Sequence, residues 1–184
     1  EFYFSTVPEG PLSPRLAALQ AGDIVRVAPK PNGFLVLDEV PPSIHLWLVS
    51  TGTGIGPFLS ILKTPEPWQR FQRVVLVHAV RTADELAYRR TIARIAEVEP
   101  KRFAYIPFLS REAADYALAG RIPQAIGDGR LEARAGLALD ATLAHVMLCG
   151  NPAMVEDATA ALAARGFRKH KRKEPGQISI ETYW

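Results

Sequence analysis

One stretch decides the fold of this 184-residue chain: Val49-Ser50-Thr51-Gly52-Thr53-Gly54-Ile55-Gly56-Pro57-Phe58. The apolar run before it, Ile44–Val49, predicts a buried strand, and the apolar residues from Ile55 onward recur at a helical spacing. Glycines between a strand and a helix let a bound anion approach the backbone, and free N–H groups at the helix start face that anion. We therefore expect a nucleotide site here, with Gly52 and Gly54 beside the ligand.

The glycine spacing leaves one alternative open. The glycines follow the pattern G-x-G-x-G, whereas the dinucleotide fingerprint is G-x-G-x-x-G. A tight strand–helix connection that binds nothing would use glycine in the same places. Pro57 fits either interpretation, because a proline in the first helical turn has no N–H group to leave unpaired.

The flanking sequence extends this pattern to a whole domain. Apolar strands and amphipathic helices alternate from residue 43 onward, which indicates an α/β fold with a parallel sheet covered on both faces. We assign residues 43–184 to this domain, whose ligands bind beyond the carboxyl ends of the strands. The predicted strands are Ile44–Val49, Val74–His78, Phe103–Leu109 and His145–Cys149, and the predicted helices are Gly56–Leu62, Ala83–Ala96, Pro123–Ile126 and Pro152–Ala164.

The first 42 residues have a different character. A short helix is predicted with Ser13 as its N-cap and Pro14 as its first residue, and strands are predicted at Glu1–Val7, Ile24–Ala28 and Phe34–Leu37. Three short elements cannot build a stable core. We interpret residues 1–42 as the carboxyl-terminal part of a β domain that ends at Pro41-Pro42, and we expect its beginning to lie upstream of Glu1.

Composition narrows the classes of function. The formal net charge is +3, which does not indicate nucleic acid by itself. A single cysteine, Cys149, excludes an internal disulfide framework and suits a reducing compartment, so we expect a cytoplasmic protein. We expect no metal site, because no second cysteine or histidine cluster accompanies it. No apolar run reaches the ~20 residues that span a bilayer, so we expect no membrane association.

Three arginines follow predicted strands or precede a predicted helix at the ligand edge. Arg81 and Arg111 come directly after two strands, and Arg121 precedes the helix at Pro123. A guanidinium group donates paired, charge-assisted hydrogen bonds to phosphate. No acidic residue ends the second strand, where an NAD site would bind the ribose hydroxyl. The pattern therefore favours NADP over NAD, although any one of these arginines could be a solvated surface residue.

The last predicted strand also ends in informative residues. Cys149 and Gly150 close the strand at the ligand edge, where a cysteine could line the pocket of a flat ring. Asn151 is placed to cap the following helix, and Asp157 lies about a turn and a half into it. A lone buried cysteine is more often a small hydrophobic residue than a ligand contact, so both interpretations stay open.

These residues carry a family resemblance. The chain resembles the bacterial ferredoxin/flavodoxin–NADP reductases, and the matching motifs keep the family's order over nearly the whole chain. They are Gly10-Pro11-Leu12-Ser13-Pro14-Arg15-Leu16, Thr51-Gly52-Thr53-Gly54-Ile55-Gly56-Pro57, His78-Ala79-Val80-Arg81, Ser110-Arg111-Glu112, Gly120-Arg121-Ile122-Pro123, Cys149-Gly150-Asn151-Pro152 and Glu181-Thr182-Tyr183-Trp184.

The resemblance implies an antiparallel FAD-binding β-barrel followed by a five-stranded parallel NADP-binding domain. It implies that FAD is contacted by Tyr3, Pro11, Leu12, Ser13, Thr53, Tyr183 and Trp184. For NADP(H) it implies Gly52, Gly54, Val80, Arg81, Ser110, Arg111, Arg121, Asn151, Pro152, Ala153 and Asp157. Family members also carry an Arg-x-Tyr-Ser-type motif upstream, which this sequence lacks. The resemblance thus implies that the amino-terminal part of the flavin domain is missing.

The implied reaction is hydride transfer between nicotinamide and flavin, followed by single-electron exchange with ferredoxin or flavodoxin. In this chemistry the protein aligns two rings and excludes water. Thr53 lies near both rings in this interpretation, and we expect Cys149 and Glu181 to shape the nicotinamide pocket, with Glu181 able to relay a proton. Two alternatives stay open: an NADPH-dependent flavin or oxygenase reductase of the same superfamily, and a non-enzymatic NADP-binding remnant.

The densest basic run is Arg165-Gly166-Phe167-Arg168-Lys169-His170-Lys171-Arg172-Lys173. Most such runs are solvated faces. In a reductase this run could also attract an acidic ferredoxin or flavodoxin, an effect that salt would weaken. Nucleic acid is a weaker interpretation, because only Phe167 places an aromatic ring among the charges. We expect a monomer.

Overall fold

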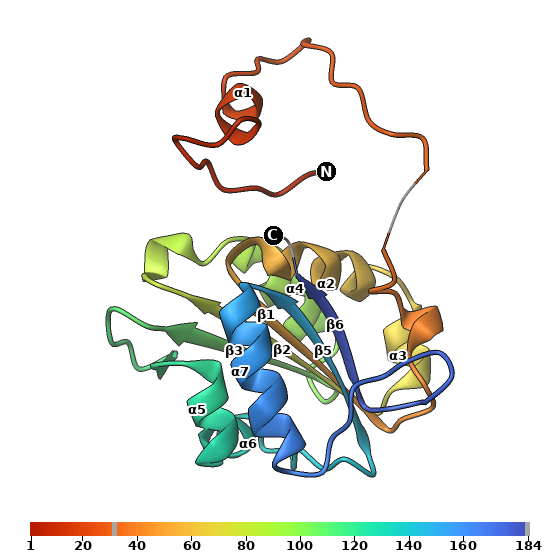
Figure 1. The fold of residues 1–184 in the computed structure, drawn as a ribbon. Helices are drawn as coiled ribbons and strands as arrows, with labels where there is room; N and C mark the ends of the chain where they lie inside the picture. The colour runs from red at the N-terminus through yellow and green to blue at the C-terminus, as the bar shows by residue number, and fades with distance from the viewer. Residues whose placement is uncertain (31–32, 183–184) are drawn as a thin grey trace. The chain divides into compact units, whose positions relative to one another are not determined.

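The computed structural model describes residues 1–30 and 33–182. The chain forms two compact units, Glu1–Gly33 and Phe34–Trp184 (Figure 1). Residues 34–42 belong to the larger unit, where Leu35, Leu37 and Val40 are buried. The assignment of residues 1–42 and 43–184 to separate functional domains stays a prediction.

Among its described residues the smaller unit contains one short helix, α1 (Ser13–Ala17), which carries a proline at its start. The predicted N-cap was wrong by one residue: Leu12 is the N-cap and Ser13 is the first helical residue, whose hydroxyl does not cap the helix. The turn before it is closed by the Ser13 hydroxyl, which accepts a hydrogen bond from the Val7 N–H at 2.8 Å. The strands expected at Glu1–Val7 and Ile24–Ala28 do not form among the described residues, because neither segment has a partner for a hydrogen-bonded ladder. The third, expected at Phe34–Leu37, is irregular and leads into the 3-10 helix η1 (Leu37–Glu39).

The larger unit is built on a parallel sheet with the strand order β4-β3-β2-β1-β5-β6. All four strands expected from the sequence are present, and two more flank them, so the sheet has six strands among the described residues rather than five. The strands are β1 (His45–Thr51), β2 (Arg73–Val80), β3 (Phe103–Leu109), β4 (Leu118–Ala119), β5 (Ala144–Gly150) and β6 (Ile178–Thr182).

Helices cover both faces of this sheet, with α5, α6 and α7 on one face and α2 and α4 on the other (Figure 1). Alternate side chains of each strand point to opposite faces of the sheet. Trp47 and Val49 pack in one core with Ile126 of α5 and Leu162 of α7. The helices are α2 (Ile55–Leu62), α3 (Glu66–Arg70), α4 (Arg89–Val98), α5 (Ile122–Gly127), α6 (Arg130–Ala135) and α7 (Pro152–Ala163), with 3-10 turns η2 (Gly52–Gly54) and η3 (Ala83–Glu85).

One predicted helix starts later than expected. The sequence predicts a helix over Ala83–Ala96, but the chain makes the turn η3 there and α4 begins only at Arg89. Tyr88 has a left-handed backbone with φ of 59°. A right-handed helix cannot pass through that conformation, so the segment divides into two pieces.

The strand order reverses between β1 and β5, because β2 and β3 lie on one side of β1 and β5 and β6 on the other. A crevice at the carboxyl ends of the strands forms at such a reversal. The glycine turn η2 follows β1, and Gly150 ends β5. The fold therefore brings the two glycine-containing strand ends together. Among the described residues, no helix is long and apolar enough to cross a membrane.

Candidate functional site

The glycine turn packs directly against the end of β5. A Cβ atom on Gly54 would lie 2.4 Å from the Cys149 carbonyl oxygen, and one on Gly150 would lie 2.2 Å from the Thr51 hydroxyl oxygen. The same Thr51 hydroxyl accepts a hydrogen bond of 2.9 Å from the Asn151 N–H. These two glycines are needed because two loops touch. The sequence reasoning missed this role for Gly54.

Gly52 has the conformation expected of a ligand-facing turn. Its φ is +51°, a left-handed value, and a Cβ at this position would meet nothing within 4 Å. Glycine is therefore favoured here because it adopts this left-handed backbone conformation without strain, and not because space is short. The space beside Gly52 is open enough for a ligand to approach the backbone.

A buried histidine, quoted above in a motif but given no role of its own, holds this turn. His78 of β2 is fully buried, and its Nε2 lies 3.0 Å from the Gly52 carbonyl oxygen. Because a carbonyl only accepts, Nε2 carries the hydrogen in this contact. Burial lowers the pKa of His78 to about 4, and the hydrogen bond to Gly52 offsets only part of that change. His78 is therefore neutral near pH 7.

The loops after β2 and β3 are joined through their backbones. The Arg111 N–H donates to the Arg81 carbonyl at 2.9 Å, and the Ser110 N–H donates to the Val80 carbonyl at 3.1 Å. The Gly120 N–H then donates to the Leu109 carbonyl at 3.1 Å, which returns the chain toward Arg121. As expected, the segments that carry Arg81, Arg111 and Arg121 lie close together at the carboxyl edge of the sheet.

The side chains of these three arginines are uncommitted within the part of the chain that the structure describes. Arg81, Arg111 and Arg121 are exposed, and their guanidinium groups make no hydrogen bond or ion pair there. By contrast, Arg130 bonds Asp128 at 2.8 Å and the Ala119 carbonyl at 3.0 Å. Exposed guanidinium groups are suited to phosphate. Two carboxylates lie in the same loops, where Glu85 accepts from the Arg81 N–H at 3.1 Å and Glu112 accepts from the Ala83 N–H.

The β5–β6 end of the crevice places Cys149 and Glu181 in register on neighbouring strands. Cys149 is fully buried, so a bound ring could touch its thiol only if neighbouring atoms moved. Glu181 and Thr53 are half-buried. Asn151 caps α7 as expected, since its Oδ1 accepts from the N–H groups of Ala153 and Met154 at 3.0 and 3.3 Å.

The remaining expected contacts are distributed as follows. Pro152 and Ala153 form the first turn of α7, and Asp157 is exposed on the same helix. The smaller unit holds Tyr3, Pro11, Leu12 and Ser13, and Ser13 is engaged in the turn with Val7. Tyr183 and Trp184 lie outside the described residues. The contacts expected of all these residues stay predictions.

The basic run is partly used inside the protein. Arg165 bonds Glu132 at 2.5 Å, and Arg172 bonds Glu39 at 2.7 Å. Lys169 and Lys173 are exposed. This run precedes β6, so it lies at the amino end of that strand, whereas the three uncommitted arginines follow strand ends. Whether it attracts an electron carrier stays a prediction.

Comparison with known proteins adds the family. Residues 48–160 match the family model of the oxidoreductase NAD-binding domain. The chain is 46% identical to the flavodoxin/ferredoxin–NADP reductases of Shigella flexneri and of Escherichia coli K12, and each alignment covers 100% of this chain and 75% of the relative.

A solved structure supports the same relationship. A ferredoxin NADP+ reductase from Neisseria gonorrhoeae, with bound FAD and NADP, superposes with a TM-score of 0.91 at 35% identity. The match covers 97% of this chain and 72% of that one. The likeness therefore extends over both compact units of the chain.

Proposed function

The chain belongs to the flavodoxin/ferredoxin–NADP reductase family, and we propose that it transfers hydride between NADP(H) and FAD and exchanges single electrons with ferredoxin or flavodoxin. One observation in this chain carries the proposal. Arg81 and Arg111 come from loops joined by a backbone hydrogen bond, and with Arg121 they present exposed guanidinium groups at the carboxyl ends of β2, β3 and β4, without an ion pair among the described residues. The relatives' names and the cofactors in the Neisseria structure support it independently.

The donor set fits the phosphates of NADP(H). Arg81, Arg111 and Arg121 would bind the 2′-phosphate, because guanidinium groups pair with its oxygens and no acidic residue ends β2, where an NAD site would bind the ribose hydroxyl. The open space at Gly52 would admit the backbone of the dinucleotide. Further contacts would come from Gly54, Val80, Ser110, Asn151, Pro152, Ala153 and Asp157.

FAD would be held mainly by the smaller unit and by the carboxyl terminus. Tyr3, Pro11, Leu12 and Ser13 would contact it from residues 1–33, with Thr53 on the glycine turn and with Tyr183 and Trp184. Bound FAD would supply the chemistry of accepting a hydride as an electron pair and releasing electrons one at a time. The side chains of this protein would orient the rings and exclude water.

Glu181 and Thr53 would act at the nicotinamide end of the crevice. Glu181 is half-buried at the end of β6, so its carboxylate could hold a proton while remaining in contact with solvent. Cys149, directly across from Glu181 in the sheet, would support the floor of this pocket. We further propose that the protein is a cytoplasmic monomer.

Titration of the FAD-loaded protein with NADPH and NADH tests the proposal. We expect NADPH to bind more tightly and to reduce the flavin, and added ferredoxin or flavodoxin to make cytochrome c reduction possible. Flavin reduction with no dependence on such a carrier would indicate a reductase of another substrate class. A protein that prefers NADH, or binds neither coenzyme, would contradict the proposal.

A further inference from the structure

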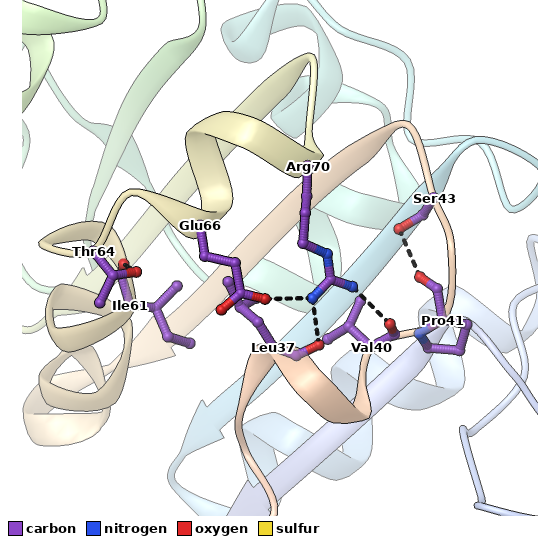
Figure 2. A network of polar contacts seen from close by, with 8 residues as sticks. All are labelled: Leu37, Val40, Pro41, Ser43, Ile61, Thr64, Glu66 and Arg70. Carbon is purple, nitrogen blue, oxygen red and sulfur yellow. Dashed lines mark hydrogen bonds and ion pairs between the residues drawn. The ribbon is translucent and has the colours of Figure 1, made fainter.

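The segment that leads into the sheet, residues 34–43, is fixed to the larger unit by two arginines from different elements. We name it the connecting segment. Figure 2 shows Arg70, the last residue of α3, reaching across to it. Arg70 Nη1 donates to the Leu37 carbonyl at 2.7 Å, and Nη2 donates to the Val40 carbonyl at 2.9 Å. Both acceptors belong to the turn around η1.

Glu66 holds the guanidinium of Arg70 in place from one turn earlier in α3. The Arg70 Nη1 to Glu66 Oε1 distance is 2.6 Å. An exposed ion pair of this kind contributes little by itself. Here it orients a planar group whose two nitrogens serve two carbonyls, so the geometry depends on the fork of an arginine.

The helix that carries Arg70 is itself fixed to the start of the sheet. Trp68 of α3 donates through Nε1 to the Leu62 carbonyl at 3.2 Å and packs its ring edge against Phe103 of β3, with centroids 6.0 Å apart. Arg102 donates to the Trp68 carbonyl. Arg70 therefore extends from a short helix with several attachments to the domain.

A second arginine reaches the connecting segment from the hairpin before β6. Arg172 makes two hydrogen bonds to Glu39, at 2.7 and 3.3 Å, and its guanidinium lies 5.0 Å from the centre of the Phe34 ring. Leu35, Leu37 and Val40 are buried on the same segment. Side-chain burial and two separate arginines thus hold one stretch of ten residues.

We propose that Arg70 is a positioning residue for hydride transfer, because it fixes the course of the chain that joins the flavin-binding part to the nucleotide-binding sheet. This inference rests on the proposed function. The connecting segment enters β1, and β1 ends at the glycine turn. If this segment is loose, the chain that leads from residues 1–33 into β1 is less constrained, and the fraction of molecules with aligned rings falls. Hydride transfer depends steeply on such alignment.

Arg165 supplies a matched control. It also bonds one carboxylate, Glu132, and two main-chain carbonyls, those of Ile126 at 3.0 Å and Leu139 at 3.3 Å. Its side chain is 29% exposed, against 31% for Arg70. The partners of Arg165 lie in α5, in α6 and in the residues after α6, and none of them belongs to the connecting segment. Arg165→Gln should therefore cost similar stability without loosening that segment.

The experiment compares Arg70→Gln, Arg70→Lys and Arg165→Gln in the FAD-loaded protein. Rapid mixing with NADPH measures the flavin-reduction rate, calorimetry measures NADP+ binding, and hydrogen exchange measures protection of residues 34–43. For Arg70→Gln we expect reduction slowed roughly tenfold, NADP+ affinity within twofold of the parent, and faster exchange confined to residues 34–43. Arg70→Lys should be intermediate, since an ammonium group cannot reproduce the fork.

Two outcomes would overturn the inference. One is equal flavin-reduction rates in Arg70→Gln and Arg165→Gln, and the other is unchanged exchange at residues 34–43 when Arg70 is replaced. Failure of the proposed function looks different, because the parent protein itself would then show no reduction by NADPH. The exchange measurement needs no catalysis, so it tests the attachment in either case.

Discussion

Arg81, Arg111 and Arg121 differ from several other arginines of the larger unit in what their guanidinium groups contact. Arg70, Arg102, Arg130 and Arg165 each bond a carboxylate. The three at the carboxyl edge have no such partner among the described residues. A free, exposed charge contributes little to stability, which agrees with the proposed role of these three side chains in binding phosphate.

Replacing Arg111 by alanine should weaken NADPH binding and leave NADH binding nearly unchanged. One charge-assisted hydrogen bond to phosphate contributes about 1.5–3 kcal/mol, which is at least about tenfold in affinity. Parallel titrations with both coenzymes measure the difference. Arg168→Ala is the control, because Arg168 is exposed between α7 and β6, at the amino ends of the strands. Equal losses for NADPH and NADH would argue against a 2′-phosphate contact.

His78 and His145 make folding sensitive to mild acid. Burial lowers the pKa of each to about 4, with further lowering of the pKa of His145 by His170 and Arg70. In the unfolded chain each of these histidines takes up a proton below its ordinary pKa near 6.5. In the folded protein it does so only near pH 4. Stability is therefore complete above pH 6.5 and falls as the pH drops toward 4.

At pH 5 the free energy of unfolding is lower than above pH 6.5 by roughly 2 kcal/mol for each histidine, at about 1.4 kcal/mol per pH unit. Urea unfolding from pH 7.5 to 4.5 measures it. His78→Gln keeps a donor for the Gly52 carbonyl but does not titrate, so its stability curve should be flatter over this range. A curve parallel to that of the parent would show that His78 is not the group responsible.

At the scale of elements, the glycine turn and the end of β5 form one packed unit. Gly54 faces the Cys149 carbonyl, and Gly150 faces Thr51. Their close approach holds the two strand ends together at the strand-order reversal. The adjacent Gly56, the second residue of α2, meets nothing within 4 Å where a Cβ would lie.

Gly54→Ala and Gly56→Ala should therefore have opposite effects on stability. The alanine methyl at position 54 would overlap backbone atoms of Cys149, and such overpacking costs about 1–3 kcal/mol. At position 56 the methyl is accommodated, and alanine in a helix gains up to about 1 kcal/mol over glycine. Thermal unfolding of the two variants checks this. Similar changes in Tm would mean that the turn can move away from β5.

At the scale of the whole molecule, exposed basic side chains lie both at the carboxyl ends of the strands and at the amino end of β6. The carboxyl edge carries the three uncommitted arginines. The hairpin before β6 carries Lys169 and Lys173, exposed, beside Arg172, which is bonded to Glu39. Charge reversal at Arg172 would disturb the connecting segment, so it cannot test carrier docking cleanly.

Lys169→Glu with Lys173→Glu is the cleaner test of an acidic electron carrier at this hairpin. If the carrier docks there, its reduction at low salt should slow about tenfold or more, because long-range steering enhances association by this order. The difference should shrink near 0.5 M salt, where the Debye length falls below about 5 Å. Arg94→Glu with Lys101→Glu reverses two exposed charges outside this hairpin and so controls for net charge, and equal rates in the two double variants would place docking elsewhere.

Much of this architecture follows from local sequence. The apolar strands, the proline-led helices and the Asn151 cap depend on residues close to one another in the chain, and the arginines after β2 and β3 follow from strand ends. The strands predicted in residues 1–33 depend on pairing partners and do not form here. Tyr88 interrupts the predicted helix through its own backbone conformation, which the periodicity does not reveal.

The sequence by itself determined the alternating α/β order, the glycine turn and the arginines at strand ends, because each is set by side chains within a few residues. Only the tertiary structure decided why Gly54 must lack a Cβ, that His78 holds the turn, and that Arg70 and Arg172 meet one segment. These contacts join residues 26 to 133 positions apart. These contacts form only when particular strands become neighbours, and the periodicity of the sequence does not predict which strands those are.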